Sequence, residues 1–165
     1  MPATPFHFGP GLLVKAVAPT QFSLAAYSVS QVVIDIESGY YLLHHATPVH
    51  REAHTFLIGG LIGLLCGLIV SRVGAWVARP RDVVREVLAA EYRLPVAVWS
   101  GVFGGVFHSV LDGIMHADIR PFRPFTQANP LYGLVSVQIL YLFCIITGVV
   151  GAGLLLARER RPRRY

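Results

Sequence analysis

Side chains that bind metal ions occur at intervals of four residues in an otherwise apolar stretch, at His108, Asp112 and His116. On an α-helix this spacing places all three on one face, about 6 Å apart from turn to turn. An aspartate near the centre of a bilayer costs roughly 2.5 kcal/mol or more, so it needs a partner or a use. The pattern therefore favours a functional face over a lipid-facing one.

Two more carboxylates, Asp35 and Glu37, interrupt the apolar run of residues 22–43. Carboxylates in such an apolar run also need a partner or a functional use. His7 precedes a short apolar segment that ends at Pro19. If the chain bends back at that proline, His7 comes within one helical turn of Asp35. The sequence thus allows a contact between these two side chains.

Another pair of imidazoles, His50 and His54, precedes a glycine-rich apolar run. Thr47 followed by Pro48 is typical of an N-cap and a first helical residue. We therefore expect a helix to begin there and to continue through residues 55–78. His50 and His54 would then share a face of its first turns.

The composition indicates an integral membrane protein. The chain has 165 residues, 54% hydrophobic and 14% charged, with a mean hydropathy of +0.56, whereas soluble domains average about 25% charged residues. Its net charge of +5 reflects arginines gathered in residues 72–93 and 158–165, as in the cytoplasmic flanks of membrane helices. This distribution differs from a basic face that reads nucleic acid, so we expect no nucleic-acid partner. Cys66 and Cys144 lie in apolar runs, where we expect small apolar side chains rather than a disulfide.

The apolar runs predict one all-α membrane domain with four spanning helices, at residues 22–43, 55–78, 95–116 and 131–157. Residues 11–18 are too few to cross a hydrocarbon core of about 30 Å, so they predict a short N-terminal half-helix. Residues 82–92 predict an interfacial helix, and residues 158–165 form a basic tail. Asn129 is the expected N-cap of the last spanning helix.

The arginines predict the orientation of the chain in the membrane. They place the C-terminal tail and residues 72–93 in the cytoplasm, as in a bacterial inner-membrane protein. Loops 44–55 and 117–129 then lie on the outer side. Imidazoles and carboxylates from three spanning segments thereby reach one level of the bilayer. This convergence predicts a metal site at the outer membrane interface.

A ligand set of imidazole and carboxylate groups without thiolates suits zinc or another divalent first-row metal. The site could hold one ion or two. The predicted ligands are Asp35, His54, His108 and Asp112, with His7 as a fifth ligand or a ligand to a second metal. Glu37 or Asp112 is the expected carrier of the catalytic proton. Residues expected to orient the ligands or contact substrate are His50, Arg51, His116, Arg120 and Arg123. The three arginines suit a phosphate or carboxylate group.

The order of these motifs resembles that of the YdjM-type family of membrane-bound metal-dependent hydrolases. The similar features are an early histidine, the acidic pair Asp35 and Glu37, Arg-x-x-His-Thr at 51–55, His-x-x-x-Asp at 108–112, and Pro-Phe at 121–122 or 124–125. The ligand order is also similar to that of the zinc-dependent phospholipase C enzymes, which implies His7, Asp35, His54, His108 and Asp112 as ligands. The chain offers no clear match to the later histidine and glutamate ligands of those enzymes.

The sequence therefore predicts a membrane-bound metal-dependent hydrolase that contacts the lipid bilayer. A phosphoester or acyl bond of a lipid-like substrate is expected, because the site lies at the level of head groups. A transporter or a proton pathway lined by the same residues is an alternative, although the inner halves of the helices are nearly all apolar. A structural membrane protein is a second alternative.

Overall fold

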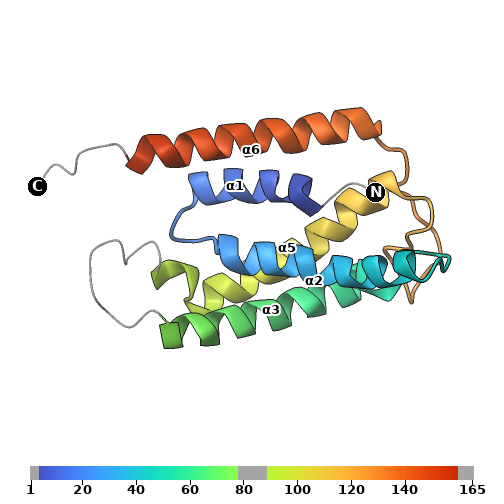
Figure 1. The fold of residues 1–165 in the computed structure, drawn as a ribbon, viewed down its shortest axis with the longest axis horizontal. Coiled ribbons are helices and arrows are strands. Elements are labelled where there is room, and N and C mark those ends of the chain that lie inside the picture. The colour runs from blue at the N-terminus through green and yellow to red at the C-terminus, as the bar shows by residue number, and fades with distance from the viewer. Residues whose placement is uncertain (1–3, 78–88, 160–165) are drawn as a thin grey trace, which may run out of the picture.

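The computed structural model describes residues 4–77 and 89–159, and every regular element in these ranges is helical (Figure 1). The elements are η1 (Thr4–His7), α1 (Phe8–Val17), α2 (Leu24–Leu43), η2 (Glu52–His54), α3 (Phe56–Val77), α5 (Leu94–Met115) and α6 (Val137–Glu159). The predicted all-α class is confirmed for this part of the chain. Most of the predicted interfacial helix at 82–92, and most of the basic tail, lie outside the described residues.

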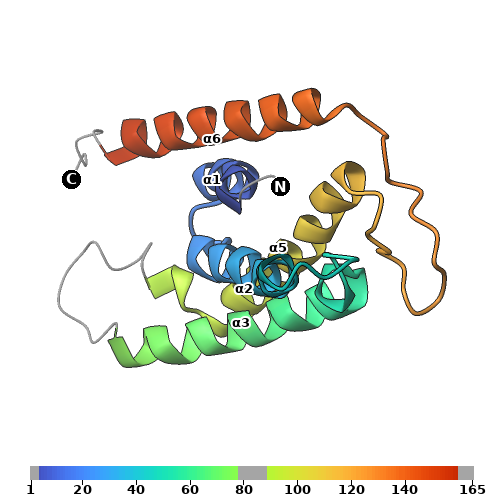
Figure 2. The same ribbon diagram turned by 45° about the vertical axis from the view of Figure 1, so that its right-hand side comes forward.

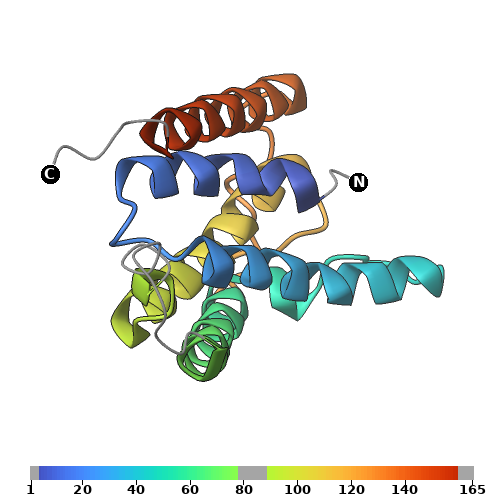
Figure 3. The same ribbon diagram turned by 60° about the vertical axis from the view of Figure 1, so that its left-hand side comes forward.

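Helices α2, α3 and α5 form one packed group, in which α3 and α5 lie against each other along much of their length. Helix α1 lies between this group and α6 (Figures 1 and 2). Figure 3 shows α1 running along α6, with the other three helices beneath the pair. The 10 residues of α1 span only about 15 Å, which agrees with the predicted half-helix.

Three helices are long and apolar enough to cross a membrane: α3 over Phe56–Gly74, α5 over Leu94–Met115 and α6 over Val137–Arg158. The sequence predicted a fourth, which corresponds to α2, but α2 is not among the candidates in the described part of the chain. It forms a helix of 20 residues. Gln31, Asp35 and Glu37 lower its mean hydropathy, which explains why α2 is not among the candidate spans.

The two faces of α2 differ in polarity. Toward the bundle it buries the polar side chains of Ser30, Gln31 and Ser38 among the apolar ones of Ala26, Tyr27 and Ile34. Away from the bundle it exposes a stripe of apolar side chains, at Val29, Val32, Ile36, Tyr40 and Leu43. Soluble helices show the reverse arrangement. An apolar outer face suits a lipid environment, while the polar inner face contributes to a site.

Glycines bring the backbones of α3 and α5 into contact. A Cβ atom added to Gly63 would lie 2.6 Å from the carbonyl carbon of Gly101, and one added to Gly59 would lie 2.9 Å from the carbonyl oxygen of Gly105. Larger residues would therefore force the helices apart. Small residues have this role in the interfaces of membrane helices. The close approach holds the start of α3 near the middle of α5.

A buried ion pair fixes the bend between α1 and α2. The Lys15 ammonium pairs with Glu91 and donates hydrogen bonds to the carbonyl oxygens of Pro19 at 2.7 Å and Phe22 at 2.9 Å. All three ammonium donors thus have acceptors, which offsets the burial of the charge. The bend folds α1 back along the bundle, so that His7 at its other end reaches α5.

Two predicted helix starts are wrong. Helix α3 does not begin at Thr47. Its N-cap is Thr55, whose Oγ1 accepts a hydrogen bond from the backbone N–H of Ile58 at 3.1 Å. The residues before Thr55 are mostly irregular because Glu37 and Asp118 accept hydrogen bonds from their backbone N–H groups.

The last helix begins at Val137 rather than near residue 131. Asn129, its predicted N-cap, has another role. The side-chain amide of Asn129 donates to the carbonyl oxygens of Gly113 at 2.9 Å and His116 at 3.2 Å. These bonds satisfy carbonyl groups at the C-terminal end of α5, which have no helical partners.

Candidate metal centre

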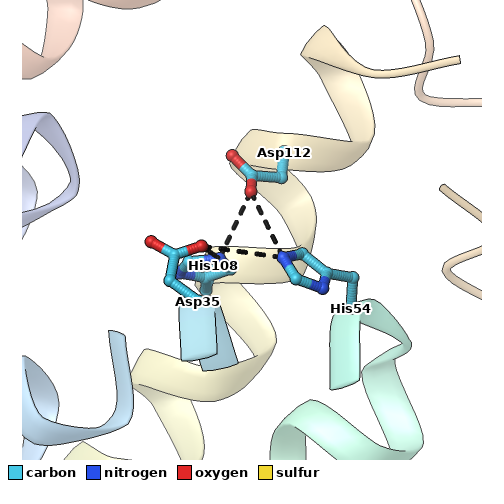
Figure 4. A group of neighbouring side chains, drawn as sticks. All are labelled: Asp35, His54, His108 and Asp112. Carbon is cyan, nitrogen blue, oxygen red and sulfur yellow. Dashed lines mark ion pairs between the residues drawn. The ribbon is translucent and has the colours of Figure 1, made fainter. Parts of the chain in front are cut away.

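Four side chains from three elements meet inside the bundle: Asp35 from α2, His54 from η2, and His108 and Asp112 from α5 (Figure 4). One ligand atom from each lies within 4.8 Å of the others. We call these four residues the central cluster. The structure thus brings together the four side chains that the sequence predicted as principal ligands.

The four His–Asp distances in the cluster are close to those between the ligands of a tetrahedral ion. Nε2 of His108 lies 3.3 Å from Oδ1 of Asp35 and 3.2 Å from Oδ2 of Asp112. Nε2 of His54 lies 3.7 Å and 3.6 Å from the same two oxygens. Ligands about 2.0–2.2 Å from a tetrahedral zinc ion lie about 3.3–3.6 Å from one another. Such an ion fits with only small movements of the side chains.

The central cluster is shielded from solvent on all sides but one. The side chains of His54, His108 and Asp112 are 0%, 0% and 3% exposed, whereas that of Asp35 is 24% exposed. Nε2 of His54 and Nε2 of His108 are buried and have no hydrogen-bond partner among the described residues. A buried polar atom without a hydrogen bond lowers the stability of the folded protein. A cation among the four side chains would satisfy both nitrogens.

Gln31 fixes the orientation of the His108 ring. Its side-chain amide nitrogen donates to the carbonyl of Gly104 at 2.8 Å, and its Oε1 lies 3.0 Å from Nδ1 of His108. Because an oxygen accepts there, Nδ1 carries a proton, and Nε2 is the ring nitrogen that could bind an ion. The sequence analysis missed Gln31. Its position four residues before Asp35, on the same face of α2, is the signal that would have found it.

Glu37 lies behind His54. Its Oε2 is 3.5 Å from Nδ1 of His54 and accepts backbone N–H groups from Arg51 at 3.2 Å and Ala53 at 3.0 Å. A carboxylate in this position orients a ligating imidazole and raises its basicity. Burial lowers the pKa of His54, but the carboxylates of Asp35 and Glu37 outweigh it, so the pKa lies above its usual value. A divalent ion would compete with a proton for His54, so its binding would strengthen as the pH rises.

His7 lies beside the central cluster rather than in it. Its Nε2 is 3.2 Å from Oδ1 of Asp112, and its Nδ1 is 3.3 Å from Nδ1 of His108. Tyr27, also missed in the sequence, donates its hydroxyl to the carbonyl oxygen of His7 at 2.7 Å. The two oxygens of Asp112 therefore have different neighbours, one facing the cluster and one facing His7. Such an arrangement suits a bridging or proton-transferring carboxylate.

A second group consists of His50, His116 and Asp118, each offering a ligand atom within 4.8 Å of the others. The sequence predicted two of them as surrounding residues but missed Asp118. Burial and the neighbouring His50 lower the pKa of His116. Burial raises the pKa of Asp118, but hydrogen bonds and charge from His50 outweigh it and leave the pKa below its usual value. The ring centroids of His50 and His54 are 4.8 Å apart, so the two groups adjoin.

The three arginines predicted to contact substrate line one surface pocket of about 790 Å³, together with His50 and Asp118. Each guanidinium contacts a nearby group. That of Arg51 lies 3.6 Å from the ring centre of Tyr41. The guanidinium of Arg120 donates hydrogen bonds to the carbonyl oxygens of Ala117 and Ile119, and that of Arg123 forms an ion pair with Glu52. The pocket is therefore polar and lies beside the second group.

Comparisons with protein-family models, with curated proteins and with solved structures find no match to this chain. What the fold and the site define is a class: an all-helical protein in its described part, with three candidate membrane spans and a His/Asp cluster that could hold a metal ion.

Proposed function

We propose that this protein is a membrane-bound metal-dependent hydrolase whose zinc ion is held by the central cluster. The observation that carries the proposal is the spacing of the four ligand atoms, which lie 3.2–3.7 Å apart across the four His–Asp pairs. Ion pairs alone would leave Nε2 of both histidines without a well-formed hydrogen bond. A cation satisfies all four side chains at once.

Substrate reaches this site at Asp35, the most exposed corner of the cluster. At this corner a water molecule or a substrate oxygen could reach an ion held by the four side chains. Zinc, when bound, supplies Lewis acidity and lowers the pKa of bound water toward neutrality. Asp112 can pass a proton to His7, whose Nε2 lies 3.2 Å from Oδ1 of Asp112. Glu37, whose Oε2 lies near Nδ1 of His54, is the other carboxylate that can carry the proton.

The proposed substrate is a phosphoester or acyl ester of a lipid-like molecule. The pocket lined by Arg51, Arg120 and Arg123 would hold its anionic head group. Apolar side chains on the outer faces of α2 and α6 are exposed and would face the acyl chains. The motif order that resembles the YdjM-type hydrolases and the zinc-dependent phospholipases supports the same reaction class.

Helix α2 is proposed to cross the membrane with the three candidate spans, because its outward stripe is apolar. The site then lies at the outer interface of a bacterial inner membrane, with the arginine tail in the cytoplasm.

Single cysteines in a background lacking Cys66 and Cys144 test this orientation. In intact spheroplasts, an impermeant maleimide should label His45→Cys, and should label Arg163→Cys only after lysis. The reverse pattern would contradict the orientation.

A structural zinc site is the second candidate, because four protein ligands are typical of structural rather than catalytic zinc. Transport is less well supported. The backbones of α3 and α5 meet at Gly63 and Gly101, which leaves little room between these two helices for a polar path.

The test compares purified wild type with His54→Ala and Asp112→Asn. Wild type should retain zinc in the central cluster and hydrolyse a phosphoester or acyl-ester bond of phospholipid vesicles, whereas both variants should lose the zinc of the central cluster and the hydrolysis. His44→Ala alters an exposed histidine after α2 and should keep both properties. Zinc that raises thermal stability without hydrolysis of phosphoester or acyl-ester lipids would favour the structural site. Wild type that neither contains nor takes up zinc would refute both candidates.

A further inference from the structure

We propose a second divalent-cation site formed by His50, His116 and Asp118, which we call the outer-loop site. It shares no residue with the central cluster and does not involve His7. The inference does not depend on hydrolytic activity. It rests on the spacing of three ligand groups, on one buried nitrogen without a partner, and on the adjoining pocket.

The first observation is the spacing of His50 and Asp118. Nδ1 of His50 lies 3.1 Å from each carboxylate oxygen of Asp118. Two ligands of one tetrahedral first-row ion lie about 3.3–3.6 Å apart. A cation can therefore lie between these two groups, with a small movement of either side chain.

His116 provides the observation that a simple His50–Asp118 ion pair does not explain. Its Nε2 is buried and has no hydrogen-bond partner among the described residues. Its ring stacks on that of His50, with centroids 4.3 Å apart and an interplanar angle of 30°. The stacking places a second imidazole beside the His50–Asp118 pair, and two imidazoles with one carboxylate are a suitable ligand set for one divalent cation.

The backbone holds these ligands in place. His116 is the C-cap of α5, and its N–H donates to the carbonyl oxygen of Asp112 at 2.8 Å. The backbone N–H of His50 donates to Asp118 at 3.2 Å. The loop before α3 and the loop after α5 therefore meet at this point, and a cation would join them.

The outer-loop site is accessible from the surface pocket. His50 and Asp118 line that pocket together with the three arginines. Three protein ligands leave at least one coordination position open. A cation there would bind an oxygen of a phosphate or carboxylate group whose remaining charge the arginines neutralise. The ligand chemistry of the site is thus a divalent cation with an oxyanion.

The experiment counts zinc bound by the full chain, purified with a histidine-free tag, stripped with chelator and titrated with Zn²⁺ alone. Wild type should bind two equivalents per chain. Asp118→Asn and His116→Gln should each bind one, and so should Asp112→Asn. Glu52→Gln changes a residue of the same pocket that is outside the site and should keep two.

Two equivalents in both Asp118→Asn and His116→Gln would overturn the outer-loop site. A single equivalent in wild type that survives in these variants but disappears in Asp112→Asn would also overturn it, while leaving the central cluster intact. The converse, one equivalent lost only in Asp118→Asn and His116→Gln, would support the outer-loop site and refute zinc at the central cluster. A thermal unfolding transition in each variant confirms that it is folded. If one of the two loop variants does not fold, the zinc count of the other decides the result.

Discussion

Each histidine of the central cluster presents one ring nitrogen to its acidic partners and has a polar side chain at the other. Gln31 contacts Nδ1 of His108, and Glu37 lies near Nδ1 of His54. These two neighbours fix which nitrogen is available to an ion. At the scale of residues, the affinity of the site should therefore depend on side chains that do not touch the metal.

Replacing Gln31 with leucine should weaken zinc binding about 10–100-fold, because the His108 ring loses the acceptor that fixes its tautomer. The affinity is measured by competition with a chromophoric chelator. Gln138→Leu, at an exposed position of α6, is the matched control and should bind zinc as wild type does. Equal affinity in the two variants would contradict the orienting role of Gln31.

Replacing Glu37 with glutamine tests which carboxylate carries the proton. We expect zinc affinity to fall about 10–100-fold, since His54 loses a charged partner. If Glu37 is the proton carrier, kcat at saturating zinc should also fall, by about 10²–10⁴-fold. Full activity at saturating zinc would show that Glu37 only orients His54. Asp112 would then remain as the proton carrier.

At the scale of elements, the contact between α3 and α5 is what sets the distances in the cluster. His54 directly precedes α3, and His108 and Asp112 lie on α5. The glycines of the two helices allow their backbones to touch. Any residue that separates the helices should therefore affect both stability and metal binding.

A Cβ atom at Gly63 would lie 2.6 Å from the carbonyl carbon of Gly101, and the backbone there has no room to yield. Gly63→Ala should thus destabilise the protein by about 1–3 kcal/mol and weaken zinc binding. At Gly60 the nearest atom to an added Cβ is Cγ2 of Val106, at 3.5 Å, which is an ordinary contact. Gly60→Ala should be neutral or stabilising by up to about 1 kcal/mol. Thermal unfolding in detergent measures the stability of both variants. Equal shifts of the thermal midpoint in Gly63→Ala and Gly60→Ala would contradict the packing argument.

At the scale of the whole molecule, an ion in the central cluster would join α2, the loop before α3 and α5 (Figure 4). A ligand that binds only the folded state stabilises it in proportion to the logarithm of one plus the ratio of the free ligand concentration to Kd. The ion would thereby act on the entire helical group rather than on one helix.

Removal of zinc with a chelator should lower the thermal midpoint of the wild-type protein. Zinc at 100 times its Kd would contribute about 2.7 kcal/mol of stability. The same chelator should lower the midpoint of Asp112→Asn by less, because the central cluster of that variant has already lost a ligand and only the outer-loop site still holds zinc. Equal midpoints for wild type with and without chelator would argue against a metal in the bundle.

The sequence by itself determined those parts of the molecule that depend on local periodicity. Apolar runs predicted the helices, and the spacing of four residues placed His108 and Asp112 on one face, as the structure has them. Both follow from the geometry of a single helix. The N-cap at Thr47 was also a local argument, yet it failed, because Glu37 from another helix holds the backbone after it.

The sequence predicted that Asp35, His54, His108 and Asp112 converge, but only the tertiary structure decided the other contacts around them. It paired Gln31 with His108, placed Asp118 against His50, and put His7 beside Asp112 rather than among the four ligands. These contacts depend on how closely α3 and α5 approach and on where the loops cross. Both depend on packing between separate elements, for which the spacing of residues along one segment carries no information.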